Sequence, residues 1–248
     1  MKAKIIYEDK HILVVYKPAG IAVQAAGAME MDLVSELKNY LNSPYVGLIH
    51  RLDQPVEGIL VFAKTAPMAA ALSRQAADGT MKKEYLAAVL SEGEMQEKVT
   101  LTDYLLKDGK TNISKVTEAS VKNAKKAVLS YEVQKMVLSK EIMAKYGLQN
   151  STNTKTLQGW ETERIALLKI ELKTGRHHQI RVQLSNADLP LLGDLKYGSE
   201  KSKQLSGMLG VRDVALCAQS LCFIHPKTGK TMEFHVSPEK EILQNLTV

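Results

Sequence analysis

The 248-residue chain has only two cysteines and no apolar run of the roughly 20 residues that a membrane-spanning helix needs. Cys217 and Cys222 are an odd number of positions apart, so on a strand they would face opposite sides, which disfavours a mutual disulfide. The sequence has no paired Cys or His typical of a zinc site and no glycine-rich nucleotide-binding loop. Near the N-terminus, charges follow too closely on a short apolar segment for a signal peptide. We therefore expect a cytoplasmic protein without a metal site or a nucleotide cofactor.

Aromatic residues make up only 5% of the chain, which gives no sign of a broad stacking platform for single-stranded nucleic acid. The charge balance is mildly basic, with 33 Lys and Arg against 27 Asp and Glu and a net charge of +6. An excess of this size is a hint of a polyanionic partner such as RNA, but it does not require one.

Apolar periodicity and turn residues predict strands and helices that follow one another without regular alternation. Helices are expected at 32–41, with Asp32 as a possible N-cap, and at 65–79, where Gly79 ends the helix. Strands are expected within 4–24, 82–90, 91–135, 164–185, 215–226 and 230–238. The polar stretch 136–163 indicates a loop insertion. This pattern predicts an α+β fold with a mixed, largely antiparallel central sheet flanked by helices and loops, as a single domain over residues 1–248.

Three separated stretches place polar, reactive groups among apolar residues. In "HRLD", at 50–53, Arg51 and Asp53 would share one face of an expected strand. The stretch "KKEYLAAV" carries Tyr85, and "LKTGRHHQIRVQL" places Arg181 inside another expected strand. A nearby arginine keeps a carboxylate ionised, so that it can act as a nucleophile or base. A structural Asp–Arg bridge with a packed tyrosine fits the same spacing, and the residues alone leave both readings open.

Four blocks, in order along the chain, resemble the RluA-type family of RNA pseudouridine synthases. They are "YEDKHILVVYKPAGIAV", "HRLDQPVEGILVFAKT", "KKEYLAAV" and "LKTGRHHQIRVQLSNADLPLLGDLKYG". The resemblance covers the chain from about residue 5 to about residue 238 and is specific because all four blocks occur together. It implies the pseudouridine synthase fold and the isomerisation of specific uridines in structured RNA, either rRNA or tRNA, to pseudouridine.

The resemblance also implies roles for individual residues. Asp53 would be the essential carboxylate, either attacking the sugar or base or abstracting a ribose proton. Tyr85 would lie against the target uracil, and Arg181 would pair with Asp53 and hold it charged. Arg51 would lie beside the carboxylate and assist rearrangement of the substrate strand. A uridine in a paired stem hides its glycosidic bond, so the nucleotide must first be flipped out.

Further contacts to the substrate RNA are expected from His50, Lys83, Arg176, His178 and Gln179. Because the implied reaction is neither a redox reaction nor a hydrolysis, it requires no cofactor and no metal. His50 is expected to be a satisfied core histidine rather than an acid or base, and the adjacent pair His177 and His178 is expected to face opposite sides of a strand. We expect a monomer with RNA as its partner.

Two features favour an alternative: the replacement at Val56 and Glu57, and the lack of room for an N-terminal RNA-binding domain. Val56 and Glu57 replace a common Thr-Ser pair, and Glu57 would add negative charge near RNA, while Tyr16 stands where the family often has Asn. The first block begins by residue 7, which leaves no room for an N-terminal RNA-binding domain. An RNA-binding or RNA-folding factor with vestigial catalysis is therefore the alternative function. A glycosidase would need a second acid near Asp53, and none stands out.

Overall fold

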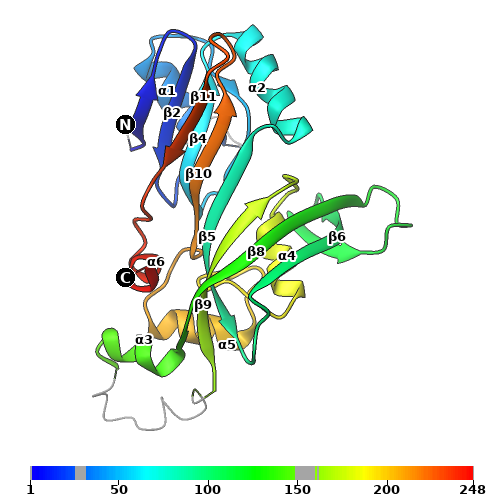
Figure 1. The fold of residues 1–248 in the computed structure, drawn as a ribbon, viewed down its shortest axis with the longest axis vertical. Coiled ribbons are helices and arrows are strands. Elements are labelled where there is room, and N and C mark those ends of the chain that lie inside the picture. The colour runs from blue at the N-terminus through cyan, green and yellow to red at the C-terminus, as the bar shows by residue number, and fades with distance from the viewer. Residues whose placement is uncertain (1, 26–31, 149–159, 161, 248) are drawn as a thin grey trace. The chain divides into compact units, whose positions relative to one another are not determined.

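The computed structural model describes residues 2–25, 32–148, 160 and 162–247 of a chain that folds into two compact units (Figure 1). The first unit comprises Met1–Tyr85 and Cys217–Glu239, and the second comprises Leu86–Leu216 and Lys240–Val248. The fold is of the predicted α+β class, with a mixed, largely antiparallel sheet flanked by helices. The single domain expected over residues 1–248 stays a prediction.

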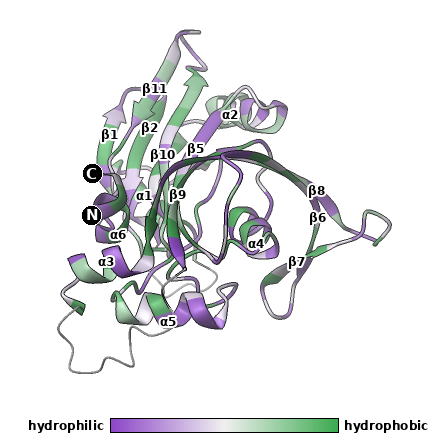
Figure 2. Cartoon of the chain, turned by 60° about the horizontal axis from the view of Figure 1, so that its bottom comes forward, coloured by the Kyte–Doolittle hydropathy of each residue, from purple (hydrophilic) through white to green (hydrophobic). Residues whose placement is uncertain are grey.

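The first unit contains strands that pair in the order β1 (Lys4–Glu8), β2 (Ile12–Lys17), β4 (Glu57–Ala63) and β10 (Leu216–Ile224). The short strand β3 (Gly47–Leu48) pairs with β4, and β11 (Thr231–His235) pairs with β10. All these pairings are antiparallel except β4 with β10, which is parallel. Apolar residues run along β2, as the green colour in Figure 2 shows, because this strand is buried on both faces.

The described residues of the first unit form two helices, and the sequence predicted both. Helix α1 (Leu33–Tyr40) begins where the side chain of Asp32 accepts a hydrogen bond from the backbone N–H of Ser35, at 2.7 Å. Helix α2 (Ala66–Asp78) has Pro67 in its first turn and ends at Gly79, whose φ of 82° is the left-handed conformation that glycine adopts without strain.

The second unit contains an antiparallel group of strands in the order β9 (Arg164–Leu172), β8 (Lys125–Leu138), β6 (Lys98–Asp108) and β7 (Ile113–Thr117). Its helices are α3 (Ser139–Lys145), α4 (Gln179–Asn186), α5 (Glu200–Met208) and α6 (Glu241–Thr247). Strand β5 (Lys82–Ser91) is continuous, with residues up to Tyr85 in the first unit and the rest in the second.

Two predicted elements differ from the structure. The expected loop insertion at 136–163 is wrong for its first ten residues, which end β8 and form α3, because Ile142 and Met143 bury one side of that helix. Residues 149–159 and 161 of this stretch lie outside the described residues. The expected strand through Arg181 is helix α4 instead, preceded by a loop in which His178 has a φ of 53°.

The two cysteines are free thiols, as expected. No described helix is long and apolar enough to cross a membrane. Phe62 and Trp160 are both buried core residues.

A polar network holds the turn between β1 and β2. The carboxylate of Asp9 accepts hydrogen bonds from the backbone N–H groups of His11 and Ile12, at 2.7 and 2.8 Å. It also accepts one from the hydroxyl of Tyr7 and lies 2.8 Å from Nε2 of the buried His225. Burial alone would raise the pKa of Asp9, but these hydrogen bonds outweigh it and lower the pKa to about 2.

This lowered pKa predicts an acid-labile contribution to stability. A carboxyl with a pKa near 3.9 when unfolded and about 2 when folded stabilises the protein above pH 4 and loses that contribution as the pH falls toward 2. Urea unfolding at pH 6, 4 and 2.5 should therefore show a steeper loss of unfolding free energy for the wild type than for Asp9→Asn, by on the order of 2 kcal/mol. Parallel pH profiles for the two proteins would contradict the assignment.

Candidate active site

Asp53 lies in a loop, and not on a strand as its apolar neighbours predict. Residues 49–56 connect β3 and β4 without strand pairing, and the backbone N–H of Val56 donates to the carbonyl of Asp53 at 3.0 Å to close a turn. Arg51 is exposed on this loop and Asp53 is half-buried. The prediction that these two residues share one face of a strand is therefore wrong. The loop places the carboxylate between core and solvent, where a substrate can reach it.

Hydrogen bonds from the "KPAG" segment, residues 17–20, hold the turn at Asp53 in place. The ammonium group of Lys17 is fully buried and donates to three backbone carbonyls, those of Pro18, Ile21 and Gln54, at 2.9 to 3.1 Å. Gly20 and Gln54 add a reciprocal pair, in which the Gly20 N–H donates to the Gln54 carbonyl and the Gln54 amide donates back. A buried ammonium is tolerated only with such partners, so Lys17 fixes the residue next to Asp53.

Tyr85 on β5 is electrostatically coupled to Asp53 within the first unit. The side chain is 5% exposed, and the pKa of its phenol is raised by burial first, then by the negative charge of Asp53. The phenol is therefore protonated at neutral pH and can donate a hydrogen bond or stack against a base. The structure thus brings together the carboxylate and the phenol that the sequence singled out separately.

His50 and Lys83 form a second coupled pair in this unit. Part of His50 is exposed, but both ring nitrogens are buried, and they have no hydrogen-bond partner among the described residues. The expectation of a satisfied core histidine is therefore wrong. Burial, and to a smaller extent the charge of Lys83, lower the pKa of His50 to about 3, so the ring is neutral at physiological pH. Burial also lowers the pKa of Lys83. Because both ring nitrogens are buried, a hydrogen bond from them to a base or ribose would require the ring to move.

The two departures from the family pattern contact each other. The hydroxyl of Tyr16, on β2, donates to the Glu57 carboxylate at 2.8 Å, and both side chains are buried. Burial and the neighbouring carboxylate raise the pKa of Tyr16. Glu57 is 2% exposed, so the expectation that it adds charge near RNA is wrong. The next residue, Gly58, lies in β4 close to the backbone of β10. A Cβ at this position would lie 2.3 Å from the carbonyl oxygen of Ala218 on β10, so the position requires glycine.

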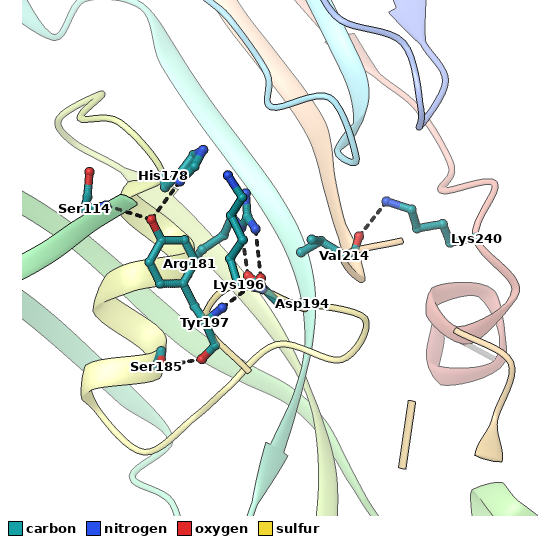
Figure 3. Close-up of polar contacts among 9 residues, drawn as sticks. All are labelled: Ser114, His178, Arg181, Ser185, Asp194, Lys196, Tyr197, Val214 and Lys240. Atoms are coloured by element: carbon teal, nitrogen blue, oxygen red, sulfur yellow. Dashed lines mark hydrogen bonds and ion pairs between the residues drawn. The ribbon is translucent and has the colours of Figure 1, made fainter. Parts of the chain in front are cut away.

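In the second unit, Arg181 forms a bidentate ion pair with Asp194. Nε of Arg181 donates to one carboxylate oxygen at 2.7 Å, and a terminal nitrogen donates to the other at 2.8 Å (Figure 3). The side chains are 5% and 1% exposed. Burial alone would raise the pKa of Asp194, but the guanidinium and the backbone N–H groups of Lys196 and Tyr197 lower it overall. The pair fixes the position of the arginine on α4.

Tyr197 connects this pair to the β6–β7 hairpin. Its ring centroid lies 5.1 Å from the guanidinium carbon of Arg181. Its hydroxyl accepts a hydrogen bond from the backbone N–H of Ser114 and lies 2.8 Å from Nδ1 of His178, as Figure 3 shows. The rings of His177 and His178 stack at 3.7 Å, so the expectation that they face opposite sides of a strand is wrong.

Two further residues predicted to contact RNA differ in exposure: Gln179 is buried, whereas Arg176 is exposed. The Gln179 carboxamide is 3% exposed, and its oxygen accepts from Thr174 and Arg176 while its nitrogen donates to Val128 and Gln183. These four bonds use its full capacity, so Gln179 holds the loop and does not have a group left for RNA. Arg176 is exposed, with Nε donating to the carbonyl of Lys126 at 2.9 Å.

Sequence reasoning assigned no role to Asp194 and Tyr197, although both lie in the "GDLKYG" part of the fourth block. The signal that could have found them is the need of a buried arginine for a carboxylate partner. The predicted ion pair between Asp53 and Arg181 stays a prediction, because the two residues belong to different units.

Comparison with known proteins decides the family. The family model described as RNA pseudouridylate synthase matches residues 11–186, a range that contains the Asp53 loop, Tyr85 and Arg181. The chain belongs to this family. The family and the enzyme class implied by the four sequence blocks are thereby confirmed.

Individual relatives of this pseudouridine synthase are similar over most of its length. It is 34% identical to the ribosomal large subunit pseudouridine synthase D of Zymomonas mobilis subsp. mobilis, over 93% of this chain and 68% of the relative. It is 32% identical to the tRNA pseudouridine synthase C of Haemophilus ducreyi, over 92% of this chain and 88% of the relative. The structure of human RNA pseudouridylate synthase domain containing 1 covers 95% of this chain and 83% of its own, with a TM-score of 0.70 and 19% identity, and shows the same fold.

The Tyr16–Glu57 contact predicts a measurable stability difference in this synthase. Tyr16→Phe removes a buried donor to a carboxylate, which we expect to lower the unfolding free energy by about 1.5–3 kcal/mol. Tyr40→Phe is the matched control, because Tyr40 donates to Glu8 at 2.9 Å with half of its surface exposed, and we expect a loss below about 1 kcal/mol. Urea unfolding compares the two variants, and equal losses would contradict an energetic role for the buried contact.

The Arg181–Asp194 pair gives a sharper prediction. Asp194→Asn keeps the size of the side chain but places an amide N–H group opposite an N–H donor of Arg181 and removes the charge. We expect a loss of about 3–5 kcal/mol in unfolding free energy. The control is Glu132→Gln, since Glu132 pairs with Lys98 at 3.8 Å on the exposed face of the same unit and should change stability by less than about 0.5 kcal/mol. A loss for Asp194→Asn no larger than that of the control would exclude a structural role for the pair.

Proposed function

We propose that this pseudouridine synthase converts one or more specific uridines of ribosomal or transfer RNA to pseudouridine. Relatives named for both RNA classes are about a third identical to it over more than nine-tenths of the chain. The observation that supports the proposal most strongly is the half-buried Asp53, held on a clamped turn and coupled to the phenol of Tyr85.

The reaction rearranges bonds within one nucleotide. The bond between N1 of uracil and C1′ of ribose breaks, the base turns, and C5 bonds to C1′. N1 gains a proton and C5 loses one, so no atom or electron is exchanged with another reactant. We propose Asp53 as the catalytic carboxylate, acting either as a nucleophile or as a base toward ribose. The protonated phenol of Tyr85 stacks on the uracil or donates a hydrogen bond to it.

We further propose that Arg181 pairs with Asp53 when the substrate is bound. Its Asp194 partner supports this proposal, because a guanidinium already held in place loses little conformational entropy on meeting a second carboxylate. The exposed Arg51 would contact the RNA strand beside the flipped nucleotide. His50, Lys83 and His178 would contact the base, ribose or neighbouring phosphates.

The chemistry requires no electron carrier and no water as reactant, and we propose that no cofactor or metal takes part. We also propose that the protein acts as a monomer in the cytoplasm, where ribosomal and transfer RNA of bacteria are made.

The alternative of an RNA-folding factor without catalysis loses one of its supports. It rested partly on the replacement of Thr-Ser by Val56 and Glu57. In the structure, both side chains are buried, and Glu57 has a hydrogen-bond partner from β2. The replacement is therefore accommodated by the fold and does not place a charge in the path of RNA.

Substitution of Asp53 tests the function. Asp53→Asn should lower the rate of pseudouridine formation by about 1000-fold or more, because an amide is neither a nucleophile nor a base, while RNA affinity is retained. The measurement is pseudouridine mapping on RNA from cells that lack the gene, after incubation with each protein. Asp78→Asn, at the exposed end of α2, is the control and should keep the full rate.

Absence of new pseudouridine in both rRNA and tRNA with the wild-type protein would overturn the proposed function. A full rate for Asp53→Asn would overturn the catalytic assignment alone. Rescue of a deletion phenotype by Asp53→Asn would favour the RNA-folding alternative.

A further inference from the structure

The second unit carries a cavity of about 330 Å³ beside the β6–β7 hairpin. Its walls come from the end of β6, from β7, from the start of β8 and from the loop before α4. The lining residues are Leu105, Leu106, Lys107, Ser114, Asn123, Lys125, Gly175, Arg176 and His177. The lysine-rich run at 122–126 and Arg176 are about 50 positions apart in the sequence, and the fold brings them to one cavity.

The cavity is cationic. Lys107, Lys125 and Arg176 are exposed, and its lining contains no carboxylate. The hairpin and its return, residues 104–126, contain six lysines and two acidic residues, which is +4 of the net +6 of the whole chain. Of the two acids, Asp108 is engaged by the N–H of Lys110 and the hydroxyl of Thr111 within the hairpin turn. Much of the excess charge of the protein therefore lies on this hairpin and its return, and Lys107 and Lys125 bring two of the six lysines to the cavity.

The hydrogen-bonding groups of the cavity are suited to an anion. Nε of Arg176 donates to the carbonyl of Lys126 at 2.9 Å, which orients the guanidinium at the rim. Ser114 and Asn123 supply a hydroxyl and a carboxamide. Arginine, lysine and small polar side chains together are the usual partners of phosphate oxygens.

The cavity is also connected to Arg181. Oγ of Ser114 lies 2.8 Å from Nδ1 of His177, and the backbone N–H of Ser114 donates to Tyr197, whose ring covers the guanidinium of Arg181. The cavity therefore shares Ser114 with the hydrogen-bonded group that positions Arg181.

We propose that this cavity binds neighbouring phosphodiester groups of the substrate RNA, with Lys107, Lys125 and Arg176 as its cationic contacts. The proposal rests on the proposed function, in that the protein must act on RNA. Each lysine–phosphate contact releases about one counterion, so it steepens the dependence of RNA affinity on salt by about 0.7–0.9 in log–log slope.

The test measures RNA binding as a function of salt. The variant Lys107→Gln/Lys125→Gln, in an Asp53→Asn background that prevents turnover, is titrated with unmodified tRNA and large-subunit rRNA transcripts between 50 and 200 mM salt. We expect the slope of log affinity against log salt to become shallower by roughly 1.5 and the affinity at 50 mM salt to fall about tenfold. Lys107→Arg/Lys125→Arg keeps both charges and should retain the wild-type slope.

The matched control is Lys98→Gln/Lys140→Gln. It removes the same number of charges from exposed positions at the far end of β6 and on α3. A slope change in this control as large as that in the cavity variant would show a general charge effect and overturn the proposal. So would an unchanged slope and affinity in the cavity variant.

The outcomes separate this proposal from the proposed function. With catalytically intact Asp53, the cavity variant should raise KM for RNA. Wild-type protein that forms no pseudouridine but shows the expected loss of salt slope in the variant would overturn the function and keep the phosphate site. Wild-type protein that forms pseudouridine, with a variant of unchanged slope, would overturn the site alone.

Discussion

A charged group of this protein can be buried only where other groups of the protein bind it, and this constraint organises the second unit around Arg181. The guanidinium is 5% exposed, and isolated burial of such a charge would cost several kcal/mol. Asp194 meets it with two hydrogen bonds, and the backbone N–H groups that follow Asp194 bind the same carboxylate. The chain after Asp194 is thereby bent so that Tyr197 lies over the arginine. The loop before α4 and the β6–β7 hairpin are then attached through the hydroxyl of that tyrosine.

The same constraint shapes the first unit. Lys17 is fully buried and uses three carbonyls, one of which belongs to the turn that carries Asp53. Tyr16, one position earlier, points to the other face of β2 and meets Glu57. Adjacent residues of one strand thus hold the loop of residues 49–56 at two places, at its turn and at its junction with β4. The departures from the family pattern at Tyr16 and Glu57 depend on each other. Either residue alone would leave a buried polar group without the hydrogen bond between the Tyr16 hydroxyl and the Glu57 carboxylate.

Sequence reasoning predicted the strands where apolar residues alternate with polar ones, as in β8, and where they form a short continuous apolar run, as in β5 and β10. It failed at α4 because this helix is buried on nearly all sides, so Ile180, Val182 and Leu184 alternate with polar residues as they would on a strand. The polar residues between them are buried too, and Gln183 bonds to Asp103 and to the carbonyl of Ala127. It singled out Asp53, Tyr85 and Arg181, but it gave no role to Asp194, because a buried arginine calls for a carboxylate partner without indicating which one, and Asp194 is 13 positions away. Nor could it show that the ring nitrogens of His50 are unsatisfied, which depends on packing alone.

The distribution of charge bears on how the enzyme could meet the cost of extracting a nucleotide. Flipping a base costs a few kcal/mol, and the reacting groups cannot supply that energy before the base reaches them. Contacts to phosphates remote from the reacting atoms can, because binding energy from non-reacting parts of a substrate offsets distortion at the reacting part. A basic hairpin whose Ser114 binds both His177 and Tyr197 joins such remote contacts to the element that carries Arg181. Under this proposal, electrostatic binding of the RNA and positioning of the arginine would involve one hydrogen-bonded group, that of Ser114, His177 and Tyr197.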